Sequence, residues 1–220
     1  MPKLVFDPVG EHEYQEGVQE CALFLSTGEA YTTGVAWNGL IGLDENPTGA
    51  EAQPFYANNK KYLNLLSKEE FGGTIHAYTY PEEFKKCLGY KEVAKGLVAT
   101  GQTHVPFGLA YKVGIGSDDK ASYEKGYEIH LVYGALAKPV TKGYKTQADS
   151  AEPMQFDFEF TTTPVDVPGC KPTATLVISS KTADPENLKA FEEKIYGDSS
   201  EGTATLPSPE EVIALFPEVM

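Results

Sequence analysis

Arginine is absent from the sequence, and each of the 18 basic residues in the 220-residue chain is a lysine. The planar guanidinium group of arginine is the usual group that binds phosphates and the edges of guanine bases. The chain also carries a formal net charge of −14 at pH 7. These features argue against a protein that binds nucleic acid tightly and are compatible with a protein surface that repels nucleic acid.

Cysteine is scarce as well, since Cys21, Cys87 and Cys170 are far apart and form no C-x-x-C motif. This number and spacing argue against a disulfide scaffold and favour reduced thiols in a cytoplasmic protein. The first residues lack the apolar core of a signal peptide, and no segment approaches the ~18 apolar residues of a membrane span. We therefore expect a soluble chain, made inside a cell, with no membrane partner.

Aromatic and turn-forming residues are abundant, with 13 Tyr, 11 Phe, 21 Gly and 15 Pro. The aromatics suffice for a packed core, and the glycines and prolines suit many short strands joined by turns. The negative charge is concentrated at the two ends. Residues 1–50 hold eight acidic residues against Lys3, and residues 181–220 hold nine against three lysines. These ends are either solvated arms and surface helices or segments with an electrostatic role.

Local patterns predict a series of strands and three helices. The Asn38-Gly39 turn predicts a hairpin between the apolar residues on either side of it. Strands are expected at residues 62–66, 73–78, 107–115, 127–136, 156–162 and 173–179. A short helix is expected after Pro81, a second after the N-cap Asp184, and a third from the capping box that begins at Ser208. Residues 44–66 form a long connection that lacks periodicity until its strand-like end.

Catalytic and metal-binding motifs are not found in the sequence. His12 begins a segment like a zinc-protease motif, but Glu16 stands where the second histidine is required. The other histidines show no ligand spacing, and the chain has no G-x-S-x-G, G-x-G-x-x-G or P-loop motif. His76 and His130 are interpreted as sheet residues rather than bases. We expect no enzyme activity, no cofactor and no metal.

One predicted strand has a clean alternation of apolar and acidic residues. Phe156, Phe158 and Phe160 point to one side, which leaves Asp157 and Glu159 on the other. The simple interpretation is a half-buried strand with a solvent-exposed outer face. The more specific hypothesis is that this solvent-exposed face lines a channel. Glu128 is a weaker candidate for the same lining, because the apolar residues of its own strand alternate with it.

Several segments, taken together and in order, resemble the major tail protein family of long-tailed phages with non-contractile tails, particularly those of Gram-positive hosts. The segments are residues 35–40 (VAWNGL), 62–65 (YLNL), 74–84 (TIHAYTYPEEF), 106–111 (PFGLAY), 130–135 (HLVYGA), 161–164 (TTTP) and 206–212 (LPSPEEV). No single segment is specific, whereas the ordered set spans most of the chain.

The resemblance implies a mainly β fold, a β-sandwich or half-open barrel flanked by a short helix. Six copies would close into a ring by joining strands between subunits into an inner barrel. Stacked rings would form a tube through which DNA leaves the virion. The family carries no catalytic residues.

The same resemblance divides the chain into three parts. Residues 1–34 would be an acidic N-terminal segment, either an arm or the first strands. Residues 35–197 would form the tail-tube β domain, and residues 198–220 a linker with a short C-terminal helix. The long loop at residues 44–66 would contact the next ring, with Asp44, Pro47, Pro54, Phe55, Tyr56, Asn58 and Tyr62 as its candidate contact residues.

The resemblance also implies partners and a location. The chain would bind copies of itself, the tail terminator and the distal tail proteins, and would surround the tape-measure protein and DNA without binding them tightly. Assembly would take place in the host cytoplasm and the product would be part of the virion. Two alternatives stay open: a tube protein of a related secretion or contractile injection system, and a receptor-binding or decoration β-sandwich.

Overall fold

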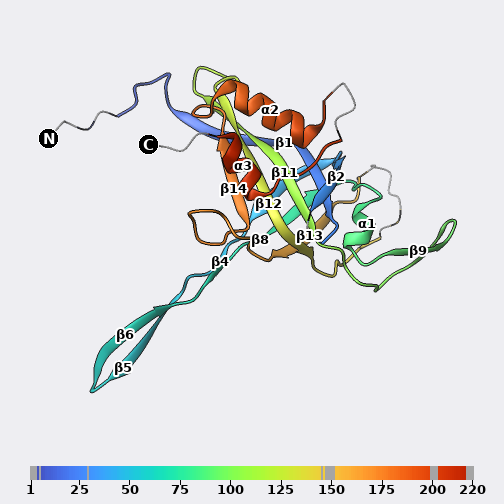
Figure 1. The fold of residues 1–220 in the computed structure, drawn as a ribbon, viewed down its shortest axis with the longest axis horizontal. Helices are drawn as coiled ribbons and strands as arrows, with labels where there is room; N and C mark the ends of the chain where they lie inside the picture. Colours follow the sequence, from blue (N-terminus) through green and yellow to red (C-terminus); the bar gives the residue numbers. More distant parts are fainter. Residues whose placement is uncertain are drawn as a thin grey trace.

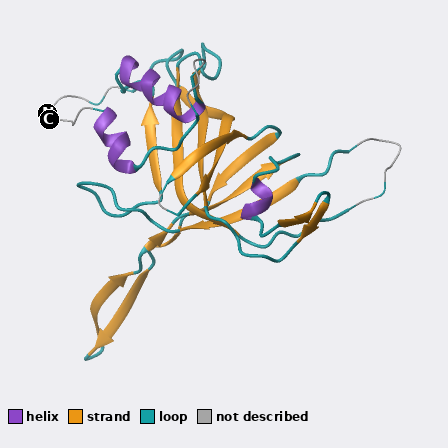
Figure 2. Ribbon diagram, turned by 45° about the vertical axis from the view of Figure 1, so that its right-hand side comes forward, coloured by secondary structure: helices purple, strands orange, loops and turns teal. Residues whose placement is uncertain are grey.

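Strands dominate the computed structural model, which describes residues 4, 6–28, 30–144, 146, 152–198 and 203–216 (Figures 1 and 2). The strands are β1 (Glu13–Ser26), β2 (Tyr31–Ala36), β3 (Leu40–Glu45), β4 (Thr48–Gly49), β5 (Ala52–Ala57), β6 (Lys60–Leu66), β7 (Glu69–Glu70), β8 (Gly72–Ala77), β9 (Lys91–Ala94), β10 (Leu97–Ala99), β11 (Phe107–Ser117), β12 (Gly126–Ala137), β13 (Phe156–Thr162) and β14 (Thr175–Ser179). The helices are α1 (Phe84–Cys87), α2 (Pro185–Tyr196) and α3 (Pro209–Leu215). The expected mainly β fold is confirmed.

Within the described residues, the main sheet contains eight antiparallel strands in the order β2-β1-β11-β12-β13-β8-β3, with β14 also paired to β12. Strand β12 pairs with β14 through residues 128–132 and with β13 through residues 135–137. Gly134 separates these two stretches at a φ of 61°, and its carbonyl accepts a 3.0 Å hydrogen bond from the Thr163 amide. The sheet therefore divides at Gly134, a conformation that glycine adopts at little cost.

Residues 37–39 connect the two ends of this strand order. They follow β2, which pairs with β1, and precede β3, which pairs with β8. The Trp37 amide donates to the Cys21 carbonyl at 2.8 Å, and the Trp37 indole N–H donates to the Thr79 carbonyl at 3.0 Å. Because so short a connection joins the first and last strands, the sheet must curve into a half-open barrel.

The turn at Asn38-Gly39 forms, with Gly39 at a φ of 80°, but the hairpin predicted around it does not. The strands on either side pair with β1 and β8 instead of with each other. Turn chemistry determines the local direction of the chain, whereas the pairing partners are set by long-range packing.

A two-stranded ribbon leaves the main sheet as a continuation of the β3–β8 pair. The ribbon continues through the β4–β7 pair to the β5–β6 pair, whose strands are joined by Asn58 and Asn59. Both asparagines have positive φ values, 51° and 59°, as the tight hairpin turn requires. In Figure 1 the β5–β6 end projects far from the body. The strand expected at residues 62–66 is confirmed as part of β6, whereas the expectation of an irregular connection before it is wrong, because that connection is mostly a β-ribbon.

The curved sheet buries a different core on each of its faces. The inner core is aromatic and includes Phe84 of α1, Phe107 of β11, and Phe158 and Phe160 of β13. The outer core lies between α2, α3 and the strands β1, β11, β12 and β14, and includes Phe191 of α2. Figure 2 shows α2 and α3 together at one end of the sheet.

The helix predictions are confirmed because their signals are local. Asp184 accepts hydrogen bonds from the Glu186 and Asn187 amides, and Gly197 ends α2. Ser208 and Glu211 form the reciprocal capping box of α3. The strands expected at residues 73–78, 107–115, 127–136, 156–162 and 173–179 correspond to β8, β11, β12, β13 and β14.

The N-terminal segment contributes strands to the body. Of residues 1–34, residues 13–26 and 31–34 lie in β1 and β2, while residues 1–3, 5 and 29 lie outside the described residues. Of residues 198–220, residues 199–202 and 217–220 also lie outside them. The β9–β10 hairpin, a second projection in Figure 1, was not anticipated from the sequence.

The aromatic inner core provides a test of the fold. Phe84 is fully buried, with ring centroids 4.6 Å from Trp37 and 5.1 Å from Phe158. We predict that Phe84→Ala lowers the free energy of unfolding by about 3–5 kcal/mol, because it removes contacts and leaves a cavity. Phe55→Ala, on the exposed β5 strand, should change it by less than about 0.5 kcal/mol. Chemical denaturation of both variants measures the difference, and equal effects would contradict the assignment of this core.

Candidate functional site

An exposed acidic surface covers the side of β13, β8 and β3 that faces away from the inner core. The strand register places Asp157 beside His76, Glu159 beside Thr74, and Thr74 beside Asp44. We call these five residues the acidic face. The side chains of Asp44, Asp157 and Glu159 are 66%, 58% and 63% exposed. Among the described residues, the outer core under α2 and α3 includes none from these three strands, so that core leaves the acidic face uncovered.

His76 lies between two carboxylates of this face. Its Nδ1 is 2.6 Å from Asp157 Oδ1, and its Nε2 is 3.1 Å from Asp44 Oδ2. The hydrogen bond with Asp157 raises the pKa of His76, although burial opposes the shift. The same bond lowers the pKa of Asp157, with help from Gln155. Through its two ring nitrogens His76 therefore links β8 to β13 and to β3, each by a contact with a carboxylate.

The alternation expected in β13 is present in the structure. Phe158 and Phe160 are 1% and 2% exposed in the inner core, and the carboxylates of Asp157 and Glu159 face solvent. Glu159 also forms a 3.1 Å ion pair with Lys138. Sequence reasoning did not connect Asp44 and His76 with these two acids, because only the pairing of β3 with β8 and of β8 with β13 brings them together.

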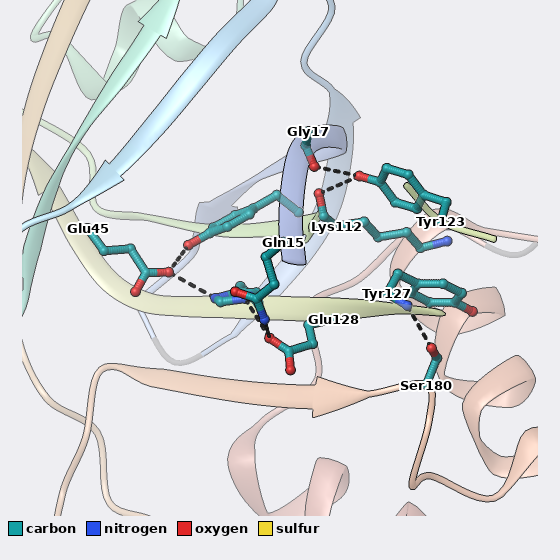
Figure 3. A network of polar contacts seen from close by, with 10 residues as sticks. Gln15, Gly17, Glu45, Lys112, Tyr123, Tyr127, Glu128 and Ser180 are labelled. Carbon is teal, nitrogen blue, oxygen red and sulfur yellow. Dashed lines mark hydrogen bonds and ion pairs between the residues drawn. The ribbon is translucent and has the colours of Figure 1, made fainter. Parts of the chain in front are cut away.

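Glu128 lies elsewhere, in a polar network at one end of the inner core (Figure 3). On β12, Glu128 and His130 share a side with Val132 of the inner core, opposite Ile129 and Leu131 of the outer core. The Gln15 amide donates to Glu128 at 2.7 Å. Glu128 is therefore on the opposite face of the sheet from Asp157 and Glu159, and the structure does not place the three candidates on one surface.

Glu45 is the centre of this network. Its carboxylate accepts a hydrogen bond from the Tyr111 hydroxyl and lies 2.9 Å from His130 Nδ1, while the His130 ring stacks on Tyr111 at 5.1 Å. The bond with His130 lowers the pKa of Glu45 in spite of burial. Burial, with the bond to Glu45, raises the pKa of Tyr111. Because Glu45 ends β3, the network fixes the base of the projecting ribbon to β11 and β12.

The remaining candidates lie along the ribbon. Asp44 is in β3, and Pro47 precedes β4; Pro54, Phe55 and Tyr56 are in β5, Asn58 is in the turn, and Tyr62 is in β6. Residues 50–70 are all exposed. Phe55, Tyr56, Tyr62, Leu65 and Leu66 are 47%, 70%, 75%, 55% and 71% exposed. A two-stranded hairpin is marginally stable alone, and so many exposed apolar side chains indicate an interaction surface.

Among the described residues, no cluster of three or more histidine, cysteine, aspartate or glutamate side chains is arranged to hold a metal ion. No helix of the described part is both long and apolar enough to cross a membrane.

The carboxylates around His76 make its titration measurable. Because the pKa of His76 is raised on folding, its contribution to stability is complete below the ordinary histidine pKa and is lost as the pH rises through the raised value. Asp157 has the opposite pH dependence: because its pKa is lowered on folding, its contribution to stability is lost as the pH falls through the lowered value. We predict that Asp157→Asn lowers the pKa of His76, as followed by NMR titration. Asp7→Asn is the control and should leave it unchanged; no difference between the variants would contradict this assignment.

Comparison with known proteins agrees with these observations. The family model "Phage tail tube protein" matches residues 25–198. No curated protein matches the chain. Among solved structures, the sheath-tube complex of an extracellular contractile injection system, PVC, in its extended state is similar, with 8% identity and a TM-score of 0.33. That similarity covers 73% of this chain and 88% of the other. Because the family match covers most of the chain, the protein belongs to the phage tail tube protein family and is a structural subunit of a tail tube.

Proposed function

We propose that six copies of this chain close into a ring and that the rings stack into the tube of a long, non-contractile phage tail. Strands joined between subunits form the inner barrel, and DNA passes through it into a Gram-positive host. Assembly takes place in the host cytoplasm, around the tape-measure protein, with the tail terminator and distal tail proteins at the two ends. The subunit has a structural role and performs no catalysis.

The uncovered acidic face is the observation that carries this proposal. A wall facing DNA must be free of covering helices, polar, and without groups that hold phosphate, because each phosphate contact slows movement. The acidic face suits these conditions, because Asp44, Asp157 and Glu159 are exposed in a chain without arginine. Its basic neighbours, His76 and Lys138, are paired with these carboxylates. We therefore assign Asp157 and Glu159 to the lumen and add Asp44. Glu128 is left out because it lies on the other face of the sheet.

The projecting ribbon supports the stacking of rings. Its apolar side chains are exposed in the single subunit, and its tip lies far from the body (Figure 1). A contact with the next ring would bury those side chains and stabilise the ribbon. Closure of strands between subunits would likewise remove free sheet edges, which otherwise aggregate at random.

Stacking through the ribbon is tested by removing its outer part. Residues 51–67 are replaced with Asn-Gly, which preserves the β4–β7 pair as the base of a shorter hairpin. We expect the intact chain to form tubes in negative-stain microscopy, and the shortened chain to remain folded by circular dichroism without forming long tubes. Normal tubes from the shortened chain would contradict the stacking role. A strictly monomeric intact chain over a wide range of protein and salt concentrations would contradict self-assembly.

The lumen assignment is tested by charge reversal. Virions built with Asp157→Lys and Glu159→Lys should eject DNA more slowly than the wild type, and raising the salt concentration should reduce the difference, because lysines facing the lumen bind phosphate. The control carries Glu92→Lys and Glu124→Lys, the same charge change at exposed sites outside the acidic face. Unchanged ejection from virions in which all subunits carry the two lumen substitutions would rule out the assignment.

A further inference from the structure

A groove runs between the second half of α2 and the strands β1 and β2. Its lining includes Glu20, Trp37, Glu192, Glu193, Tyr196 and Ala204, and its volume is about 710 Å³. Trp37 is buried in its wall, whereas Glu20 and Glu193 are half exposed at the rim, 51% each. The groove is thus an apolar hollow with acidic edges; we call it the α2–β2 groove.

The base of the groove is fixed by Lys112 of β11. Its ammonium group lies 2.7 Å from Glu20 and 2.8 Å from Glu192, and it is 5.0 Å from the ring centroid of Tyr196. Burial alone would lower the pKa of Lys112, but the hydrogen bonds to Glu192 and Glu20 outweigh it and raise the pKa. Lys112 therefore stays charged and links Glu20 of β1 to Glu192 of α2 at the base of the groove.

Two local features show that the groove is an unusual part of the body. Glu20 has a φ of 51° in a bulge of β1, between Gln19 and Ala22. Strain of this kind in a non-glycine residue is common at functional sites. The Tyr196 hydroxyl is buried without a hydrogen-bond partner among the described residues, which is rare in folded proteins.

The tip of the projecting ribbon matches the groove in chemistry. Tyr56 and Tyr62 are 70% and 75% exposed there, beside Lys60 and Lys61. These lysines form no ion pair within the described part of the chain. The groove lining contains three glutamates, Glu20, Glu192 and Glu193, against Lys112 and Lys189, a balance of −1. The ribbon tip is thus basic and aromatic, although the chain as a whole has a net charge of −14. Its charge and its apolar rings complement those of the acidic, partly apolar groove.

The positions of tip and groove exclude a contact within one subunit. In Figure 1 the ribbon projects from one end of the molecule, while α2 and β2 lie towards the opposite end. A tip and a groove at opposite ends form a head-to-tail contact, in which each copy donates to the next and leaves a free groove and a free tip. Such contacts either close into a ring or continue as an open stack, and the second geometry is the one that stacked rings require.

From these observations we infer that the ribbon tip, residues 55–62, docks into the α2–β2 groove of a subunit in the adjacent ring. The inference rests on the proposed stacking of rings and names the surface that receives the ribbon. Tyr56 and Tyr62 pack against the apolar wall, and Lys60 and Lys61 contact the glutamates of the rim.

Photo-crosslinking locates the contact directly. A photoreactive phenylalanine analogue replaces Tyr62, and tubes are grown from a mixture of isotopically light and heavy subunits. Irradiation should link the probe to residues 34–38 or 189–197 of a different subunit, as read by mass spectrometry. The control places the same probe at Leu97 of the β9–β10 hairpin, which is 60% exposed, and should give no link to the groove. Tubes in which the Tyr62 probe links only to other surfaces, such as the acidic face, would overturn the inference and leave the proposed function intact.

Charge reversal gives a second measurement that does not depend on the probe. Lys60→Glu with Lys61→Glu should raise the protein concentration needed for tube formation by on the order of tenfold, and Glu193→Lys added to that variant should recover part of the loss. Lys91→Glu with Lys95→Glu, on the other projecting hairpin, is the matched control and should have little effect. Equal effects of the two lysine pairs, or no recovery with Glu193→Lys, would overturn the docking site. If the unmodified chain forms no tubes, the proposed function fails and the inference fails with it.

Discussion

The main sheet has to cover apolar side chains on both of its faces, and the chain supplies little helix for that task. The curvature of the sheet and α1 enclose the inner core, and α2 and α3 cover the outer core over β1, β11, β12 and β14. In the described part of the chain, the outward side of β13, β8 and β3 has no such cover. Its side chains must therefore tolerate water, and here they are aspartate, threonine, histidine and glutamate. The acidic face is a consequence of where the helices lie.

Features that depend on neighbouring residues could be predicted from the sequence. The caps at Asp184 and Ser208 specify α2 and α3 within one turn of chain, and the alternation in β13 separates phenylalanines from acids. Strand β1 gave a poor signal because residues 13–17 are exposed and mostly polar, and because bulges interrupt its register. In the outer ribbon only the β6 part, residues 62–66, gave a signal, because both sides of the ribbon are exposed and its apolar residues follow no buried face.

Features that depend on pairing between distant strands could not be predicted. Alternation within β12 and within β13 shows that Glu128 and Asp157 each oppose an apolar side. It does not show whether the two residues share a side of the sheet, which depends on how the chain passes Gly134. The link between His76, Asp44 and Asp157 has the same origin, since three strands must be in register before these residues meet. The candidate site was thus partly visible in the sequence, and its membership was decided by the topology.

The ribbon also determines how mechanical force would enter the subunit. Its two strands are the extensions of β3 and β8, so a pull along the ribbon draws both strands in the same direction. Strand β8 is held by β13 through six register pairs, from Phe156 opposite Ala77 to Thr161 opposite Gly72. A pull parallel to these strands loads their hydrogen bonds together in shear, rather than opening them one after another. If the ribbon joins adjacent rings as proposed, a tail that bends or is stretched would transmit tension through β8 to β13, the strand that carries Asp157 and Glu159. The proposed wall of the channel would then also be its tensile element.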